Sequence, residues 1–203
     1  MVDAVDFWRS HDGDAYHHRN SATNVQLQSR IDLWSDILRH IKRPNSILEV
    51  GAGEGQNLKA LGALCPYSEL AAIEPNEAAR AFMVRSMIVA EGNARDGLAT
   101  ALPYSDFDFD LVFTSGVLIH IPPENLLLAC SEIYRVAARY IIIIEYFSAE
   151  PEMKLYRGEA DKLWKRDFGQ FWVDNFPLTT VACGFAWKHL TGLDNLTWWI
   201  FEK

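Results

Sequence analysis

The stretch Ile47-Leu48-Glu49-Val50-Gly51-Ala52-Gly53-Glu54-Gly55 decides the fold. Its apolar residues predict a short parallel strand that is covered on both faces. Its three glycines, Gly51, Gly53 and Gly55, allow positive φ angles and a close approach of the backbone to a ligand. Residues 56–61 then begin a helix, whose unpaired N–H groups and positive dipole end point toward that ligand. We therefore predict a site for a polar or anionic ligand at this turn.

The spacing of the glycines separates two kinds of ligand. The dinucleotide fingerprint reads G-x-G-x-x-G, whereas this turn reads G-x-G-x-G, with Glu49 two residues before the first glycine. An NAD-dependent oxidoreductase would have its third glycine one position later than Gly55. A tight turn with no ligand also fits the stretch taken alone, so the rest of the chain has to decide.

A second apolar strand is expected over residues 70–73, and it ends at Glu74-Pro75-Asn76. Glu74 follows Gly53 by about 20 residues, and an acidic residue at the tip of the second strand can accept hydrogen bonds from both ribose hydroxyls of a nucleoside. The alternative is an ordinary loop carboxylate. We predict that Glu74 and its neighbour Pro75 belong to a site for an adenosine-type ligand.

A helix over residues 77–83 and a third strand over residues 87–90 are expected next. The loop that follows the third strand is where such folds hold the adenine. We therefore expect the side chain of Asn93 or the backbone of Ala94 to bind the adenine amino group and ring nitrogens. A plain turn is the alternative.

Two further strands are expected over residues 109–114 and 140–146, with a helix between them that opens at Pro122-Pro123. The second of these strands is continuous and β-branched, which is typical of a central parallel position. Ser115 and Val117 follow the fourth strand at the carboxyl edge of the sheet. Open α/β sheets bind their ligands at this edge, so we assign both residues to the cofactor site.

Three candidate catalytic residues, His120, Glu145 and Tyr146, are predicted at the same edge. The His120 imidazole can titrate near neutral pH and act as a general base, and a structural histidine under the Pro-Pro turn is the alternative. Glu145 is compatible with a base, an anchor for a substrate amine or a structural partner. Tyr146 is compatible with a hydrogen bond to the acceptor or with packing.

The two ends of the chain complete the predicted architecture. We predict that residues 1–22 form an ordered flap, with a disordered tail as the alternative. An amphipathic helix follows, with apolar residues from 27 to 41 at three- and four-residue spacing. A helix over 167–176 precedes two strands, 179–188 and 196–202, which lie too close in sequence to be parallel. The chain predicts an α/β fold: a Rossmann-like, seven-stranded, mostly parallel sheet with a C-terminal antiparallel hairpin, in a three-layer sandwich. We expect a single domain over 1–203, with 1–43 as flap and helix and 44–203 as core.

Composition excludes several classes of protein. The 203 residues carry a formal charge of −8 with no basic run, which argues against a nucleic-acid partner. The longest apolar run, 140–144, is too short to cross a bilayer, and the N-terminus lacks the features of a signal peptide. We expect a cytoplasmic protein with no membrane partner. Cys65, Cys130 and Cys183 lie far apart without a CxxC pair, so we predict three buried thiols and neither a disulfide nor a metal site.

With these elements in register, the chain resembles the class I S-adenosylmethionine (SAM) methyltransferases over nearly its full length. It is more specifically similar to the pseudaminic acid biosynthesis-associated methylases, in tracts that run from residue 7 to the C-terminus. These tracts are Phe7-Trp8, Gly13-Asp14-x-Tyr16-x-x-Arg19-Asn20, Gly116-Val117-Leu118-Ile119-His120-Ile121, Glu132-x-Tyr134-Arg135, Arg139-Tyr140-Ile141, Glu145-Tyr146, Tyr156-Arg157-Gly158, Asp161-Lys162-Leu163, Lys165-Arg166-Asp167-Phe168, Gly184-Phe185 and Thr197-Trp198.

The resemblance implies SAM as the cofactor and S-adenosylhomocysteine as its product. Glu49 and the glycine turn would lie beside the amino-acid part of SAM. Tyr16 and Arg19 would belong to the flap, with Arg19 meeting the SAM carboxylate.

The acceptor that the resemblance implies is a small polar molecule, methylated at oxygen or nitrogen. A sugar or a nonulosonic-acid (pseudaminic acid-type) metabolite fits best. Tyr156 and Arg157 would contact it, with Lys165 and Arg166 as further donors to a carboxylated sugar. A solvated charged face is the alternative for these basic residues.

Two other functions stay open at this point. One is a non-catalytic SAM-binding scaffold or sensor, which would bind SAM tightly without turnover and would tolerate the loss of His120 and Glu145. The other is an NAD-dependent oxidoreductase, which the predicted terminal hairpin disfavours.

Overall fold

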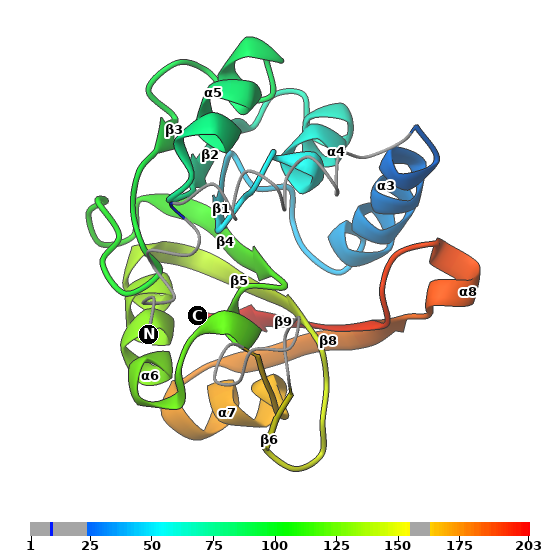
Figure 1. Ribbon diagram of the computed structural model, residues 1–203, viewed down its shortest axis with the longest axis vertical. Coiled ribbons are helices and arrows are strands. Elements are labelled where there is room, and N and C mark those ends of the chain that lie inside the picture. Colours follow the sequence, from blue (N-terminus) through cyan, green and yellow to red (C-terminus); the bar gives the residue numbers. More distant parts are fainter. Residues whose placement is uncertain (1–8, 10–23, 155–162) are drawn as a thin grey trace.

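The computed structural model describes residue 9 and residues 24–154 and 163–203 (Figure 1). Its centre is a seven-stranded sheet with the strand order β3-β2-β1-β4-β5-β9-β8. Strands β1 to β5 are parallel, and β9 runs antiparallel to both β5 and β8. The sheet strands are β1 Ser46–Val50, β2 Glu69–Ile73, β3 Ala94–Arg95, β4 Phe109–Ser115, β5 Ala137–Glu145, β8 Thr179–Ala186 and β9 Leu196–Glu202. The predicted fold class is confirmed.

Helices cover both faces of the sheet (Figure 1). Because side chains alternate along a strand, successive residues of β5 enter different cores. Ile142 and Ile144 pack with residues of α3 and α4, whereas Ile141 and Ile143 pack with residues of α6 and α7. The helices are α3 Asn24–Leu38, α4 Gln56–Leu64, α5 Glu77–Arg85, the 3-10 turn η1 Leu118–His120, α6 Pro123–Val136, α7 Phe168–Asn175 and α8 Lys188–Thr191. The three-layer arrangement is therefore also as predicted.

The predicted third strand over residues 87–90 is wrong. Met87 has a φ of 54°, and the Ile88 N–H donates to the Met83 carbonyl at 2.9 Å, so these residues form a turn after α5. The true third strand, β3, lies later and pairs Ala94 and Arg95 with the end of β2. Four consecutive apolar residues resemble a short buried strand in sequence, but here Met87 is exposed and Val89 is buried.

Smaller differences lie in the last third of the chain. The charged segment that follows β5 contains a two-stranded ribbon of β6 Glu152–Met153 and β7 Trp164–Lys165. The connection between β8 and β9 includes the short helix α8. Cys65 and Cys130 are buried as predicted, but Cys183 is exposed on the edge strand β8.

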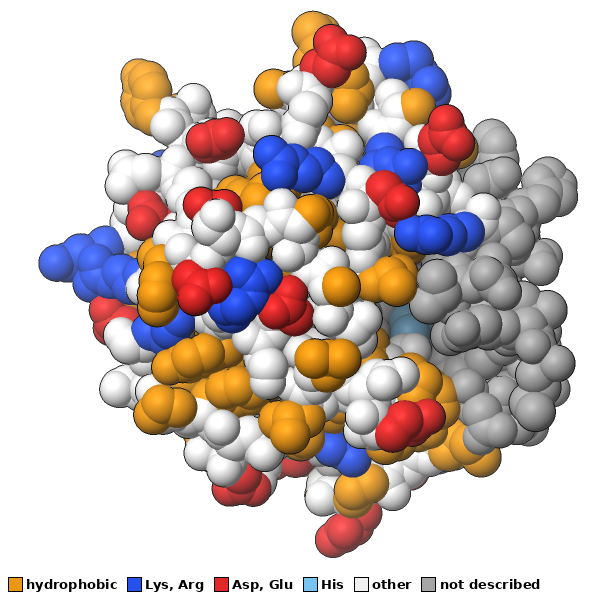
Figure 2. Space-filling model, turned by 90° about the vertical axis from the view of Figure 1, so that its left-hand side faces the viewer, with side chains coloured by type: hydrophobic (Ala, Val, Ile, Leu, Met, Phe, Trp, Pro, Cys, Tyr) orange, Lys and Arg blue, Asp and Glu red, His pale blue; other side chains and the backbone are white. Residues whose placement is uncertain are grey.

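On the face that Figure 2 shows, Lys and Arg side chains are interspersed with Asp and Glu side chains. This visible face has no broad basic surface of the kind that binds a phosphate backbone. In the described ranges, no helix combines the length and the apolar character that a membrane crossing needs.

Candidate active site

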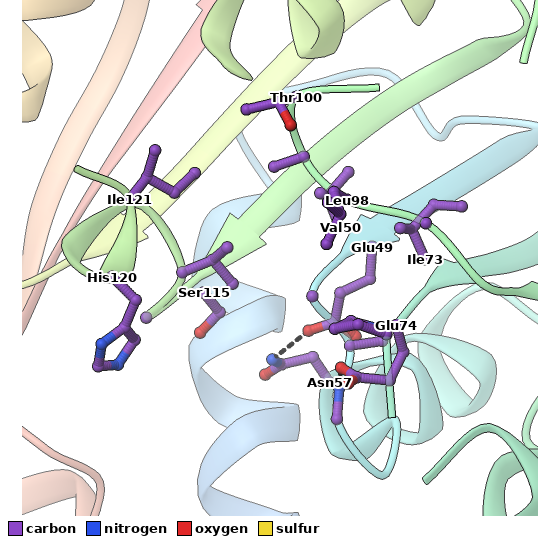
Figure 3. Close-up of a pocket in the computed structure, with 18 of the residues that line it drawn as sticks. Glu49, Val50, Asn57, Ile73, Glu74, Leu98, Thr100, Ser115, His120 and Ile121 are labelled. Carbon is purple, nitrogen blue, oxygen red and sulfur yellow. Dashed lines mark hydrogen bonds between the residues drawn. The ribbon is translucent and has the colours of Figure 1, made fainter. Parts of the chain in front are cut away.

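A cavity of about 320 Å³ lies at the carboxyl edge of the parallel strands (Figure 3). The glycine turn, the tip of β2, the loop after β3, the turn after β4 and the helices α3, α4 and α6 all contribute to its wall. The lining residues are Arg30, Glu49, residues 50–54, Gln56, Asn57, residues 73–75, residues 97–100, residues 115–117, residues 120–122 and Asn125. In Figure 3, His120 and Ile121 lie on one side of the cavity and Ile73 and Glu74 on the other.

The glycine turn forms part of the cavity wall, and its glycines have left-handed backbone angles. Gly51 has a φ of 75°, and a Cβ atom there would lie 2.6 Å from Cγ2 of Val117. Gly51 therefore allows the turn after β1 and the turn after β4 to meet. Gly55 has a φ of 72° and packs against Met83 of α5 instead, outside the cavity lining.

Glu49 is a buried carboxyl group in the cavity wall. It is 1% exposed, and its Oε1 accepts a 2.8 Å hydrogen bond from Nδ2 of Asn57 at the start of α4 (Figure 3). Its Oε2 has no hydrogen-bond partner among the described residues. Burial raises the pKa of Glu49 to about 8, although Asn57 and the charge of Arg30 oppose the shift. An unpartnered buried oxygen favours a ligand that donates to it.

Glu74 lies at the carboxyl tip of β2, as predicted, and is only 4% exposed. Its Oε2 accepts from the N–H of Gly53 at 2.7 Å, and its Oε1 accepts from the N–H of Asn76 at 2.9 Å. Burial raises the pKa of Glu74, and the two backbone hydrogen bonds oppose that shift. Since each carboxylate oxygen has a second lone pair, Glu74 can accept two more hydrogen bonds from a diol.

The described lining has more carboxyl groups than basic groups. Glu49, Glu54 and Glu74 contribute three carboxyl groups, whereas Arg30 contributes the one guanidinium among the lining residues. Because burial raises the pKa of Glu49 to about 8, this group is protonated in the ligand-free protein at pH 7 and would ionise beside a cationic ligand. A pyrophosphate would gain no such interaction, so the site favours a cation over a dinucleotide.

Residues 48–140 match a family model described as a methyltransferase domain. This part of the chain is a methyltransferase domain. SAM is the cofactor of this kind of domain, and an acidic wall suits the positive charges of a sulfonium and an ammonium group. No curated protein matches the sequence.

Several solved structures with the same fold are methyltransferases. A magnesium protoporphyrin IX methyltransferase from Synechocystis, with bound S-adenosylhomocysteine, is 14% identical, with a TM-score of 0.73 over 98% of each chain. A 1,6-didemethyltoxoflavin-N1-methyltransferase from Burkholderia thailandensis is 15% identical, with a TM-score of 0.71 over 100% of this chain and 87% of that chain. A SAM-dependent methyltransferase from Methanosarcina mazei is 15% identical, with a TM-score of 0.64 over 83% and 96%. At these identities the likeness shows the fold.

The methyltransferase cavity brings together many of the residues predicted from sequence. Those that line it are Glu49, Gly51, Gly53, Glu74, Pro75, Ser115, Val117 and His120. Tyr16, Arg19, Tyr156 and Arg157 lie outside the described residues, so their predicted roles stay predictions.

The predicted adenine contacts are at the wrong end of β3. Nδ2 of Asn93 donates to Oε1 of Glu69 and to the carbonyl of Leu70, near the start of β2. Asn93 lines a separate hollow of about 460 Å³, and Ala94 lies in the strand itself. The error follows from the misplaced third strand, because the loop that reaches the cavity is residues 97–100.

Glu145 and Tyr146 also lie outside the cavity lining. Glu145 is fully buried behind the turn that follows β4. The Tyr146 hydroxyl donates to Oδ2 of Asp194 at 2.6 Å. The ammonium of Lys165 lies 4.9 Å from the Tyr146 ring centroid, and Arg166 lies over Phe171. The described structure therefore places none of these four residues in the cavity.

Sequence reasoning missed several polar groups of the wall, above all Arg30, Asn57 and Asn125. Arg30 lies on the helix before β1, and Asn125 in the first turn of α6. The signal for Asn57 was available, because it is the second residue of the helix that the glycine turn begins. Arg30 and Asn125 depend on how distant helices meet the sheet, which local spacing does not reveal.

Proposed function

We propose that this protein transfers the methyl group of SAM to an oxygen or nitrogen atom of a small polar acceptor, a sugar or nonulosonic-acid (pseudaminic acid-type) metabolite. The observation that carries the proposal is the cavity itself. On one side of the cavity, Glu49 has a buried oxygen without a partner, and Glu74 can accept hydrogen bonds from a diol. His120 lies on the other side of the cavity. The tracts shared with the pseudaminic acid-associated methylases support the sugar acceptor.

The residues of the wall fit SAM. Oε2 of Glu49 would accept a hydrogen bond from the ammonium group, and Arg30 beside it would bind the carboxylate. Glu74 would bind the ribose hydroxyls, and residues 97–100, with Pro75, would surround the adenine. Gly51 fits because any side chain at this position would collide with Val117. When bound, SAM supplies an electrophilic methyl group on sulfur.

His120 would act on the acceptor side. An acceptor hydroxyl has to lose its proton as the new bond to carbon forms, and a nitrogen of the His120 imidazole would take that proton. A neutral amine acceptor needs no base during the transfer itself. Asn125 would orient the acceptor by a hydrogen bond, so that its nucleophilic atom lies in line with the methyl group.

Calorimetry with SAM and with NAD, followed by mass spectrometry of candidate sugars incubated with SAM and the protein, tests this proposal. We expect saturable SAM binding, no NAD binding and the gain of one methyl group on a sugar or nonulosonate. Tight SAM binding without methylation of any acceptor would favour the scaffold or sensor function. NAD binding without SAM binding would overturn the proposal.

A further inference from the structure

The buried carboxyl group of Glu145 holds a turn that lines the cavity. Its Oε1 accepts three hydrogen bonds of 3.0 Å each, from Oγ1 of Thr114 and from the backbone N–H groups of Val117 and Leu118. Thr114 is also fully buried. Three donors on one oxygen fix the backbone of the turn relative to the end of β5.

This turn contributes to both sides of the cavity. The Val117 side chain packs on the backbone of Gly51 in the glycine turn. The carbonyl of Val117 accepts from the N–H of His120 at 2.9 Å, which begins the short helix η1. The N–H of Gly116 also donates to the carbonyl of Ile144, next to Glu145. Through this turn, Glu145 is connected both to the packing of Val117 on the glycine turn and to the start of the short helix that carries His120.

The surroundings of Glu145 indicate that its carboxyl group contacts the protein and not a ligand. Its Oε2 has no hydrogen-bond partner among the described residues. Cys130 of α6 is its titratable neighbour, and the pKa of that thiol is raised by burial first and then by the charge of Glu145. The charge of Arg166 opposes this shift. Since Glu145 is absent from the cavity wall, it does not reach an acceptor from this position.

We propose that Glu145 is a positioning residue of the methyltransferase. It holds residues 115–120 so that Val117 meets the cofactor side of the cavity and His120 meets the acceptor side. The assignment of a cofactor side and an acceptor side rests on the proposed function. The hydrogen bonds by which Glu145 holds the turn do not depend on that function. The alternative is a buried group that contributes to overall stability alone.

Four variants test the proposal. Glu145→Ala removes the acceptor of all three hydrogen bonds, Glu145→Gln keeps an acceptor oxygen, and Thr114→Val removes one donor. Phe201→Leu is the matched control, because Phe201 is fully buried in β9 and lies outside the cavity lining. Each variant is compared by thermal unfolding, by amide hydrogen exchange of residues 115–121 without ligand, and by SAM affinity.

We expect Glu145→Ala to speed the exchange of residues 115–121 and to weaken SAM binding by about 100-fold, the effect of a displaced wall. Thr114→Val should give a smaller change in the same direction. Glu145→Gln should restore exchange and affinity close to wild type, and Phe201→Leu should lower stability without selectively exposing the turn.

Equal exchange of residues 115–121 in Glu145→Ala and Phe201→Leu would overturn the proposal, and so would unchanged SAM affinity in Glu145→Ala. A wild-type protein that binds no SAM would instead overturn the proposed function. In that case the exchange measurement, which needs no ligand, still decides whether Glu145 holds the turn.

Discussion

Glu49 and Glu145 are two buried glutamates near the carboxyl ends of parallel strands, and they point to opposite faces of the sheet. Glu49 shares a face with Ile47, in the core with α3 and α4, whereas Glu145 shares a face with Ile143, in the core with α6 and α7. Each has one oxygen without a partner in the described structure. Only Glu49 lines the cavity. The comparison shows that two buried carboxyl groups at the ends of parallel strands can have different surroundings: Glu49 lines the cavity, whereas Glu145 accepts hydrogen bonds from the turn after β4.

The largest effect is expected where the two turns meet, at Gly51. Gly51→Ala adds a methyl group 2.6 Å from Val117 and places alanine at a φ of 75°. We expect a loss of about 1–3 kcal/mol in the free energy of unfolding and a loss of about 100-fold in SAM affinity.

Denaturant unfolding and calorimetry check this prediction, with Gly92→Ala as the control. Gly92 is also left-handed, at a φ of 90°, but an added Cβ would meet nothing within 4 Å. Gly92→Ala should therefore cost stability alone. Equal losses of SAM affinity in the two variants would show that the contact between Gly51 and Val117 does not shape the site.

The SAM affinity of Glu49→Gln should differ from that of Glu145→Gln. The amide keeps the size of the side chain but loses the charge-assisted hydrogen bond to an ammonium group, which contributes about 1.5–3 kcal/mol. We expect SAM affinity to fall by roughly 10- to 100-fold, while Glu145→Gln stays close to wild type. Calorimetric titration of both variants measures the difference, and the opposite ranking would reverse the roles assigned to the two residues.

The two glutamates should also affect the pH dependence of stability. Burial raises the pKa of Glu49 from 4.5 to about 8 and that of Glu145 from 4.5 to about 7. The folded state therefore binds these protons more tightly than the unfolded state, so their contribution to stability is complete below about pH 4.5 and is lost as the pH rises to about 8.

Thermal unfolding of the ligand-free protein between pH 4.5 and 8 tests this linkage. Compared with wild type, the Glu49→Gln and Glu145→Gln variants should each lose less stability as the pH rises. Parallel curves for the three proteins would mean that neither carboxyl group titrates abnormally in the folded state.

Much of the cofactor side could be predicted from sequence because its residues follow strands directly. The apolar runs at 47–50 and 109–114 are strands as expected, and Glu74 follows β2 at the predicted place. The prediction of a strand at residues 87–90 was wrong, because a run of four apolar residues fits a buried strand even where it forms a turn after a helix. That error moved the predicted adenine contacts to Asn93 and Ala94.

The direction of Glu145 was also open from sequence alone. Because Glu145 ends β5, it was predicted to lie at the edge of the sheet where ligands bind. The alternation of side chains along a strand places Glu145 and Ile144 on opposite faces of the sheet. Which face holds the cavity depends on how α3 and the turn after β4 meet the sheet, and this is a property of tertiary packing. Two parts of the prediction stay predictions. One is the boundary at residue 43 between the flap with its helix and the core, and the other is the set of roles given to Tyr16, Arg19, Tyr156 and Arg157.

The most direct test of whether Glu49 is the carboxyl group that binds SAM is a count of the protons released when SAM binds. An ammonium group beside Glu49 would lower its pKa, so a carboxyl group that titrates at about 8 in the free protein would ionise on binding at pH 7. Calorimetry in two buffers of different ionisation enthalpy measures this release. The account predicts the release of about one proton by wild type and by Glu145→Gln, and none from this source in Glu49→Gln. Equal release by wild type and Glu49→Gln would contradict it.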